Sequence, residues 1–167
     1  MAVGLGPLPT LHPVPGFELG IASAGIKRPG RKDVVVMRCA EGSRVAAVTT
    51  TNAFCAAPVI VTRERFRGDV RYLLTNTGNA NAGTGADGLR NARRACAALA
   101  ALTGVEETAV LPFSTGVIGE PLPVEKIEGA LQAALDDLSV DHWAEAATGI
   151  MTTDTLPKGA SRQFEYD

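Results

Sequence analysis

The stretch Asp69-Val-Arg-Tyr-Leu-Leu-Thr-Asn76 decides the fold, because it leads directly into a loop of small residues that starts at Thr77. An apolar run of this length is typical of a buried strand. After the loop, apolar side chains recur every three or four residues from Leu89 to Leu102, which predicts a helix with one apolar stripe. Gly104 supplies a stop for that helix. A buried strand followed by an amphipathic helix predicts an α/β chain.

The remaining predicted elements do not alternate strictly between strand and helix. Asp33–Cys39 and Arg44–Thr51 are apolar, β-branched runs around a short turn, and they predict a hairpin. Thr108–Phe113 predicts another buried strand. One helix is predicted to open at Pro123 and another to span His142–Ile150. The mixture favours sandwich-like α+β layers over a doubly wound Rossmann sheet, within a single unit that covers residues 1–167.

The two ends of the chain carry different patterns. Residues 1–30 are rich in proline and glycine, which indicates an extended, poorly regular lead-in. Gln163–Asp167 has the alternation that begins a strand, with no turn after it. Because a domain usually ends after an element and not inside one, we expect the polypeptide of this domain to continue.

Composition argues against several classes of function. The net charge is −2, from 16 basic and 18 acidic residues, so the bulk charge gives no indication of a nucleic-acid or membrane partner. No apolar run approaches the roughly 20 residues of a membrane span, and the N-terminus lacks a basic leader. The cysteines, Cys39, Cys55 and Cys96, form neither a disulfide framework nor a zinc site. We therefore expect a cytoplasmic chain without a metal centre.

The loop Asn76–Gly88 is rich in asparagine and glycine, and it has two interpretations. Its backbone amides can approach an anionic ligand at the start of the helix. Alternatively, the asparagine side chains satisfy their own backbone in a tight loop. The loop lacks the Gly-Lys-Ser/Thr ending of a phosphate loop, and the acidic residues available for a dinucleotide site, Glu106 and Glu107, lie beyond the whole helix.

Two further segments gather hydroxyl groups. Ser114–Gly119 follows a predicted strand, so Thr115 and Gly116 can present a hydroxyl and a bare backbone N–H to the negative oxygen of an acyl-transfer intermediate. An ordinary turn, in which the hydroxyl bonds its own backbone, explains the same residues. Ile150–Lys158 clusters hydroxyls and a carboxylate just past a helix, which suits either a small ligand or an Asx or ST turn.

Other candidate groups favour structural interpretations. Lys27 can meet a substrate carboxylate, although a lone lysine near a loop is more often solvated. His12 lies in the lead-in and His142 at a helix start, so a Ser/His/Asp triad has no support. Cys55 and Cys96 are expected to be packed thiols.

Taken in their order along the chain, these motifs resemble the ornithine acetyltransferase (glutamate N-acetyltransferase) family. The resemblance covers the chain from about Gly16 to its end. The matching segments are Ala24-Gly-Ile-Lys27, Thr51-Asn52, Ala56-Ala-Pro-Val59, Asn76–Asn81, Ser114–Gly119 and Met151-Thr-Thr-Asp154.

The resemblance implies an enzyme of arginine biosynthesis. Members of the family are made as one precursor that cuts its own backbone before a threonine, and the α and β fragments assemble as an α2β2 heterotetramer. The new N-terminal threonine of β attacks the acetyl group of N-acetylornithine, and the acetyl group then passes to glutamate. No cofactor is implied, although some members also accept acetyl-CoA. This chain resembles the α portion, which is part of a larger two-chain domain and is expected to be inactive without β.

The resemblance assigns roles at matching positions only. Thr115 and Gly116 match the family's oxyanion hole, and Thr152 matches a threonine that contacts the substrate. The asparagine-rich loop departs from the family at Gly83, where many members have cysteine, so the loop is assigned no contact. Lys158 is not the family's lysine, which belongs to a later Lys-Gly-x-Gly-Met segment. The free α-amine of the β-chain threonine, with a pKa of about 8, can take the proton of its own hydroxyl.

Two other functions remain open at this point. A related self-cleaving aminopeptidase or amidase would transfer the acyl group to water instead of glutamate. A non-catalytic module would use the asparagine-rich loop and Thr152 to hold an amino-acid ligand.

Overall fold

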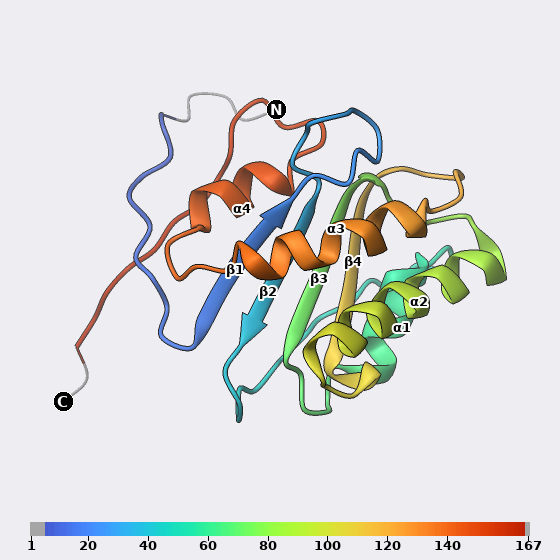
Figure 1. The fold of residues 1–167 in the computed structure, drawn as a ribbon, viewed down its shortest axis with the longest axis horizontal. Coiled ribbons are helices and arrows are strands. Elements are labelled where there is room, and N and C mark those ends of the chain that lie inside the picture. The colour runs from blue at the N-terminus through green and yellow to red at the C-terminus, as the bar shows by residue number, and fades with distance from the viewer. Residues whose placement is uncertain (1–5, 166–167) are drawn as a thin grey trace.

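Four strands form one mixed sheet in the computed structural model, which describes residues 6–165 (Figure 1). The strands lie in chain order and are β1 (Phe17–Ala22), β2 (Val34–Cys39), β3 (Tyr72–Asn79) and β4 (Val110–Val117). The pairs β1–β2 and β2–β3 are antiparallel, and β4 runs parallel to β3. The predicted mixed α/β class is confirmed, and the antiparallel pairs exclude a doubly wound parallel sheet.

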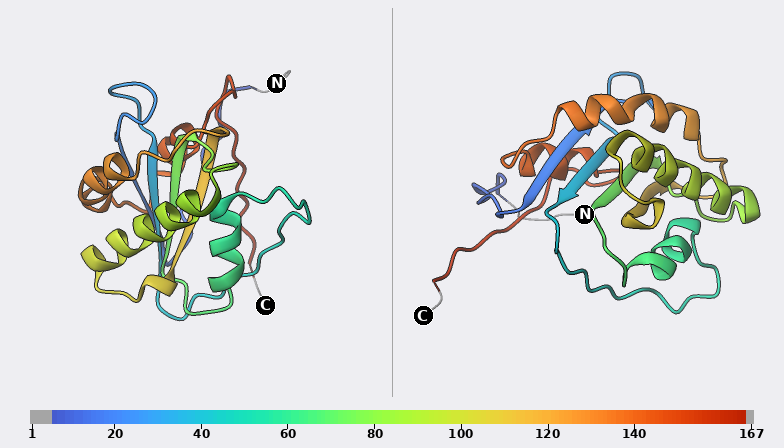
Figure 2. Two further views of the ribbon diagram at one scale, coloured as in Figure 1. Left: turned by 90° about the vertical axis from the view of Figure 1, so that its right-hand side faces the viewer. Right: turned by 60° about the horizontal axis from the view of Figure 1, so that its bottom comes forward.

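The helices lie on both faces of the sheet. They are α1 (Ala57–Arg65), α2 (Gly85–Thr103), α3 (Val124–Asp136) and α4 (Trp143–Gly149), with a short 3₁₀ turn, η1 (Glu107–Ala109), before β4. One face of the sheet packs against α2 and α3, and the opposite face of β1 and β2 packs against α4. Figure 2 shows the sheet almost edge-on, with α2 and α3 on one side and the 40–56 segment projecting on the other.

The core follows from the alternation of side chains along the strands. Val34 and Val36 of β2 point into the cluster that contains Leu99 of α2 and Leu131 of α3, whereas Val35 points to the α4 side. All five of these side chains have no exposed surface. Truncating a buried leucine such as Leu99 to alanine is expected to cost about 2–5 kcal/mol of stability, because a cavity remains.

The predicted helix over 89–102 is confirmed as α2, and its end has the expected geometry. Gly104 is left-handed at φ +71°, and its N–H donates to the Ala100 carbonyl at 2.8 Å. Glycine adopts this conformation without steric cost, which explains why the helix stops there.

The predicted hairpin of Asp33–Cys39 with Arg44–Thr51 is wrong in its second half. The first run forms β2, but β2 is already paired with β1 on one side and β3 on the other. Residues 44–51 therefore find no open edge beside β2, and they form an irregular and largely exposed segment. The segment is held instead by Arg63 of α1, whose guanidinium donates to the Thr49 hydroxyl at 2.8 Å and to the Thr50 carbonyl.

The predicted irregular lead-in over residues 1–30 is wrong for residues 17–22, which form β1 in the buried sheet. Residues 1–5 lie outside the described part of the chain. The lead-in also lies beside the C-terminal segment, since the His12 N–H donates to the Ser161 hydroxyl at 2.9 Å. No strand begins at residues 163–165, and residues 166–167 again lie outside the description.

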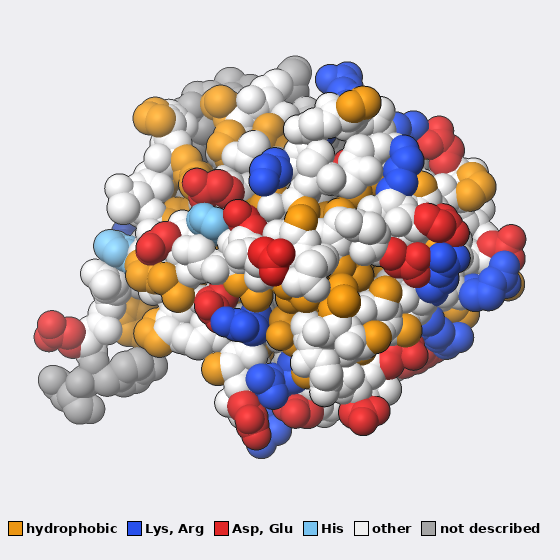
Figure 3. Space-filling view, in the orientation of Figure 1, with side chains coloured by type: hydrophobic (Ala, Val, Ile, Leu, Met, Phe, Trp, Pro, Cys, Tyr) orange, Lys and Arg blue, Asp and Glu red, His pale blue; other side chains and the backbone are white. Residues whose placement is uncertain are grey.

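The surface carries interspersed charges of both signs, as Figure 3 shows over α2 and α3. Arg94 of α2 contacts Glu125 at 2.8 Å and Glu128 at 2.7 Å on α3, and Arg93 contacts Glu64 on α1 at 3.0 Å. Exposed pairs of this kind contribute little individually, so packing of the core supplies most of the stability. Among residues 6–165, no helix combines the length and apolarity that crossing a membrane requires.

Candidate functional site

The parallel pairing of β3 with β4 brings two of the predicted motifs side by side. Thr77 lies opposite Thr115, and Gly78 lies opposite Gly116, after which the register shifts at Asn79. The Ser-Thr-Gly motif is therefore part of β4, and the prediction that the strand ends at Phe113 is wrong. The pairing extends the strand by four residues beyond that point, because β3 offers hydrogen-bonding partners as far as Asn79.

Gly116 lies where two backbones come into close contact. Its φ is +140°, and a Cβ at this position would be 2.3 Å from the carbonyl carbon of Gly78 and 2.5 Å from the Asn79 nitrogen. No side chain fits in that space, and the φ value itself disfavours residues other than glycine. The close approach therefore explains why glycine is required in β4, at the irregularity where the register shifts.

Thr115 is half-buried, and the neighbouring Gly116 is exposed. No hydrogen bond of the Thr115 hydroxyl is found among residues 6–165, so the turn in which this hydroxyl bonds its own backbone is not formed. The Thr115 hydroxyl and the Gly116 peptide group therefore lie next to each other on β4, an accessible edge strand. Gly116 has no side chain that could cover its peptide group. The role of this pair as an oxyanion hole stays a prediction.

The asparagine side chains beside this pair are fully used within the protein. The Ser114 hydroxyl donates to Asn76 Oδ1 at 2.6 Å, and Asn76 Nδ2 donates to the Asn79 carbonyl at 2.9 Å. Asn79 Nδ2 in turn donates to the carbonyls of Glu120 and Pro121, both at 3.1 Å. These bonds tie the ends of β3 and β4 to the segment that follows β4, which fixes the position of the Ser-Thr-Gly motif.

The next asparagine closes the loop onto the start of α2. Asn81 Nδ2 donates to the Gly88 carbonyl at 2.9 Å, and the Thr84 hydroxyl donates to Asn81 Oδ1 at 2.9 Å. A Cβ on Gly88 would lie 1.8 Å from the Thr84 hydroxyl, so this glycine makes room for the loop's own side chains. Of the two interpretations of the loop, the one in which its asparagines satisfy their own backbone is confirmed.

The connection between β1 and β2 lies over the same strand ends. The buried Asp33 carboxylate accepts the N–H groups of Ala24 and Ile26, both at 2.6 Å, and its carbonyl accepts the Thr77 N–H at 2.9 Å. This geometry holds Lys27 against the backbone of β3, because a Cβ on Gly78 would be 3.0 Å from Lys27 Cγ. Asp33 was not predicted from the sequence, in which it appears only as the first residue of a strand.

Lys27 has a partner and is not simply solvated. Its ammonium forms an ion pair with Glu120 at 2.9 Å, and both side chains are close to half-exposed. Glu120 follows the Ser-Thr-Gly motif, so this pair joins the β1–β2 connection to the segment after β4. An exposed pair of this kind can open at small cost when another charged group approaches.

Thr152 lies in the irregular segment after α4 and is half-buried. The preceding carbonyl, that of Met151, accepts a hydrogen bond from Arg31 of the β1–β2 connection. That connection therefore touches both the Gly78 region, through Lys27, and the Thr152 segment, through Arg31. Among the described residues, no hydrogen bond joins Thr152 to Thr115 or Gly116, and its contact with substrate stays a prediction.

A cavity of about 460 Å³ lies beside the site, between the 45–50 segment, α1 and β4. Its lining is mostly apolar and includes Val48, Pro58, Leu111 and Phe113, with Ser114 at the site itself. Val48 is fully exposed, and Phe113 is 39% exposed. The apolar residues of the 44–51 run, which the sequence analysis interpreted as a hairpin strand, contribute to this surface instead.

Exposed apolar side chains continue on the other side of the strand end. Phe54 is 63% and Ile118 61% exposed, and both lie within 4 Å of the Cβ position of Gly83. Together with Val48, Phe113 and Val117, they form what we call the apolar patch. Exposed apolar side chains on both sides of a strand end are typical of an interaction site.

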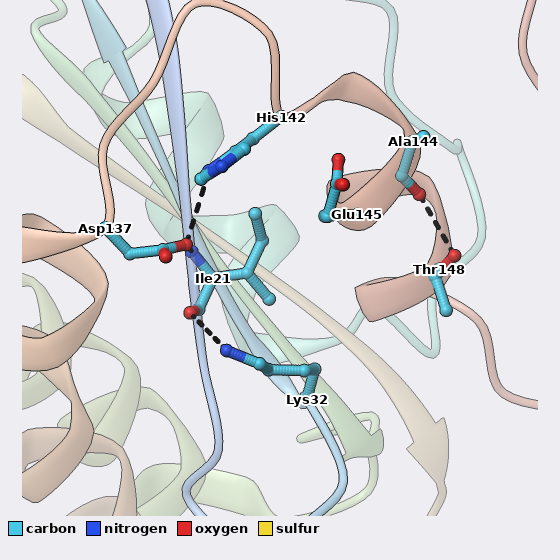
Figure 4. A pocket seen from close by; sticks show the side chains of 7 residues that line it. All are labelled: Ile21, Lys32, Asp137, His142, Ala144, Glu145 and Thr148. Atoms are coloured by element: carbon cyan, nitrogen blue, oxygen red, sulfur yellow. Dashed lines mark hydrogen bonds and ion pairs between the residues drawn. The ribbon is translucent and has the colours of Figure 1, made fainter.

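A second cavity, of about 320 Å³, lies at the opposite edge of the sheet against β1 and α4 (Figure 4). Asp137 Oδ2 accepts the Ile21 N–H at 2.9 Å and lies 3.3 Å from His142 Nδ1, and the Lys32 ammonium donates to the Ile21 carbonyl at 3.2 Å. The polar groups of this cavity thus satisfy the free backbone edge of β1, which is a structural role.

Two of the three cysteines, Cys39 and Cys96, are buried. Burial raises the pKa of the Cys96 thiol to about 12 and raises that of Cys39 as well, so both thiols are protonated at neutral pH. Among residues 6–165 there is no group of three or more His, Cys, Asp or Glu side chains that could hold a metal ion.

Comparison with known proteins gives matches over almost the whole chain. A sequence model of the ArgJ family matches residues 18–167. The arginine biosynthesis bifunctional protein ArgJ of Pseudomonas syringae pv. tomato is 83% identical over all 167 residues, and that of Methylococcus capsulatus is 57% identical over 93% of the chain. The chain spans 41% and 38% of the length of these two curated relatives.

Two solved structures have the same fold. The crystal structure of ornithine acetyltransferase complexed with ornithine from Mycobacterium tuberculosis superposes with a TM-score of 0.81 at 31% identity, covering 88% of this chain and 80% of that one. The arginine biosynthesis bifunctional protein from Bacillus halodurans superposes with a TM-score of 0.75 at 35% identity, covering 85% of this chain and 75% of that one.

Proposed function

The chain belongs to the ArgJ family, and we propose that it is the α portion of a self-cleaving acetyltransferase of arginine biosynthesis. In this proposal the enzyme transfers the acetyl group of N-acetylornithine to glutamate, and acetyl-CoA is an alternative acetyl donor. The isolated chain is inactive because the threonine nucleophile belongs to the β portion. The observation that carries the proposal is the pairing of Thr115 and Gly116 with β3 at an exposed strand end of an ArgJ-family fold.

The proposed reaction has two halves. The β-chain threonine hydroxyl adds to the acetyl carbonyl of N-acetylornithine, and the threonine's own α-amine takes the hydroxyl proton. The tetrahedral intermediate then breaks its C–N bond, the departing amine of ornithine takes up the proton, and an acetyl ester remains on the enzyme. In the second half the amine of glutamate attacks this ester, which forms N-acetylglutamate and restores the threonine hydroxyl.

Thr115 and Gly116 are suited to stabilise the oxygen that becomes negative in both halves. The Thr115 hydroxyl has no partner among residues 6–165, and the absence of a side chain on Gly116 leaves its peptide N–H accessible to a small ligand. Removing one preorganised donor of this kind typically costs about 10²–10³ in kcat. Thr152 is proposed to contact the substrate from the segment after α4.

The apolar patch supports a partner at this edge of the molecule. Its exposed members Phe113 and Val117 lie on either side of Thr115 and Gly116 in β4, so a partner that covers them also encloses the proposed oxyanion site. We propose that the remaining portion of the precursor occupies this surface, and that two such pairs form an α2β2 assembly in the cytoplasm. Covering the site in this way excludes water, which favours transfer to glutamate over hydrolysis.

The proposal is tested on the full-length protein that contains this chain. Initial rates of N-acetylglutamate formation are measured for wild type, for Thr115→Ala and for Thr148→Ala, a matched control on α4. We expect Thr115→Ala to lower kcat by about 10²–10³ with KM little changed, and the control to retain its rate. A Thr115→Ala enzyme with wild-type kcat contradicts the oxyanion assignment, and release of acetate without N-acetylglutamate contradicts the transferase.

A further inference from the structure

Thr77 is a buried threonine whose hydroxyl has no hydrogen-bond partner among the described residues. The residue is 1% exposed, and its backbone is fixed by the bond from its N–H to the Asp33 carbonyl at 2.9 Å. A buried hydroxyl without a hydrogen-bond partner destabilises the folded state. Such a hydroxyl in a native structure therefore calls for an explanation, for example a role toward a neighbouring group.

The neighbour of Thr77 is the proposed oxyanion residue. Thr77 pairs with Thr115 in the parallel β3–β4 ladder, one position before the register shifts. Paired residues of parallel strands project to the same face of a sheet, and neighbouring strands are separated by about 4.8 Å. The two side chains are therefore neighbours on one face, one strand spacing apart, a separation that a hydrogen bond between two threonine hydroxyls can span.

The surroundings keep this pair in place. Just before Thr115 in β4, the Ser114 hydroxyl donates to Asn76 Oδ1 at 2.6 Å. Just after it, Gly116 is in close contact with Gly78. The backbones on both sides of the two threonines are thus fixed, which keeps the two side chains next to each other. In the described part of the chain, two other buried polar atoms have no hydrogen-bond partner, His142 Nδ1 and Trp143 Nε1. Both belong to the α4 region, and His142 lies 3.3 Å from Asp137.

We propose that Thr77 is a positioning residue for the acyl transfer, an inference that rests on the proposed function. Its hydroxyl donates to the oxygen of the Thr115 hydroxyl and leaves the Thr115 proton free to point at the oxygen of the tetrahedral intermediate. A hydroxyl can accept one bond while it donates another, and a donated bond polarises the acceptor's own O–H. Thr77 therefore makes Thr115 a better oriented and stronger donor.

The test uses the full-length protein with Thr77→Val and Thr77→Ser. Valine keeps the branched shape and removes only the hydroxyl, whereas serine keeps the hydroxyl. We expect Thr77→Val to lower kcat by about tenfold, the size of one hydrogen bond, with KM unchanged, and Thr77→Ser to retain most of the rate. Thr75→Val, two residues earlier on the same strand and face, is the matched control and retains wild-type rates.

A double-mutant cycle with Thr115→Ala separates positioning from a purely structural role. If Thr77 acts through Thr115, Thr77→Val has no further effect in the Thr115→Ala background. An equal loss in both backgrounds, or a wild-type kcat for Thr77→Val, overturns the inference, since either result means that Thr77 does not act through Thr115. Such results with an active wild-type enzyme leave the proposed function standing, whereas an inactive wild type or an unaffected Thr115→Ala contradicts the proposed function itself.

Discussion

The backbones of Gly116 and Gly78 lie in close contact in neighbouring strands, so that a Cβ on Gly116 would be 2.3 Å from the Gly78 carbonyl carbon. This contact sits one residue beyond the Thr77–Thr115 pair and at the point where the β3–β4 register shifts. It directs the Ser-Thr-Gly motif away from regular strand geometry, which is how an edge strand can present a hydroxyl and a peptide N–H to a ligand.

Substituting alanine for Gly116 is expected to destabilise the full-length protein by more than about 3 kcal/mol, since the methyl group would overlap backbone atoms that cannot move independently. The measurement is thermal or chemical unfolding. Gly119→Ala is the control, because Gly119 also has a positive φ of +81° but nothing within 4 Å of its Cβ position. That control is expected to cost only about 1 kcal/mol, the strain of the backbone alone. Equal losses for the two variants would show that contact with Gly78 contributes nothing.

Thr152→Val is expected to raise KM for N-acetylornithine about tenfold while kcat changes little, because one hydrogen bond to bound substrate is lost. The control is Thr153→Val, the exposed neighbour, which is expected to leave both constants unchanged. Steady-state kinetics over a range of N-acetylornithine concentrations check this expectation. An unchanged KM for Thr152→Val removes Thr152 from the substrate site.

Asp33→Asn is expected to destabilise the protein by about 2–3 kcal/mol. The Asp33 carboxylate accepts the N–H groups of Ala24 and Ile26, one on each oxygen, and an amide has only one oxygen to offer. Its NH2 group would face a second N–H donor. Asp69→Asn, at an exposed position, is the control and is expected to have little effect on the unfolding midpoint. A midpoint for Asp33→Asn equal to that of the control would contradict the role assigned to this carboxylate.

Thiol labelling of the described cysteines at pH 8 is expected to modify Cys55 first. Cys55 is half-buried and lies 3.8 Å from an Arg63 nitrogen, whereas burial raises the pKa of Cys96 to about 12 and also raises that of Cys39. Peptide mapping after a short exposure to reagent checks the order, with Cys55→Ser as the control that removes the fast site. Faster labelling of Cys96 would contradict its burial.

The same raised pKa has a consequence for stability at high pH. The Cys96 thiol ionises at about 9.0 when unconstrained and at about 12 in the fold, so the unfolded chain loses its proton first. The stabilising contribution of the protonated thiol is therefore complete below pH 9.0 and is lost as the pH rises toward about 12. Cys96→Ala is expected to flatten this part of the stability profile measured by unfolding.

The spacing of apolar residues predicted those helices and strands whose position depends on the local sequence alone. The helical stripe over 89–102 and its stop at Gly104 appear as α2, and the run ending at Asn76 appears within β3. Arg44–Thr51 has an equally good strand pattern, but a strand also needs an open edge, and both sides of β2 are occupied by other strands. The position of an open edge depends on the whole sheet, which no local pattern contains.

The candidate site was predictable only in part for a similar reason. The motif around Thr115 and Gly116 was identified from its order among other motifs, whereas the six residues alone favoured an ordinary turn. Its extension of β4, its contact with Gly78 and its neighbour Thr77 all depend on pairing across more than 30 residues of sequence. The Asp33 carboxylate was missed because its partners are backbone N–H groups, which leave no trace in side-chain types.

The central claim is that this chain supplies the electrophilic half of an acetyl-transfer site to a nucleophile in the rest of the precursor. The most direct measurement is mass spectrometry of the full-length protein mixed with N-acetylornithine in the absence of glutamate. We expect one acetyl group on the N-terminal threonine of the β portion, which is released as N-acetylglutamate when glutamate is added and which forms much more slowly in Thr115→Ala. Continuous release of acetate without a trapped acetyl group, or equal rates of acetylation in wild type and Thr115→Ala, would contradict it.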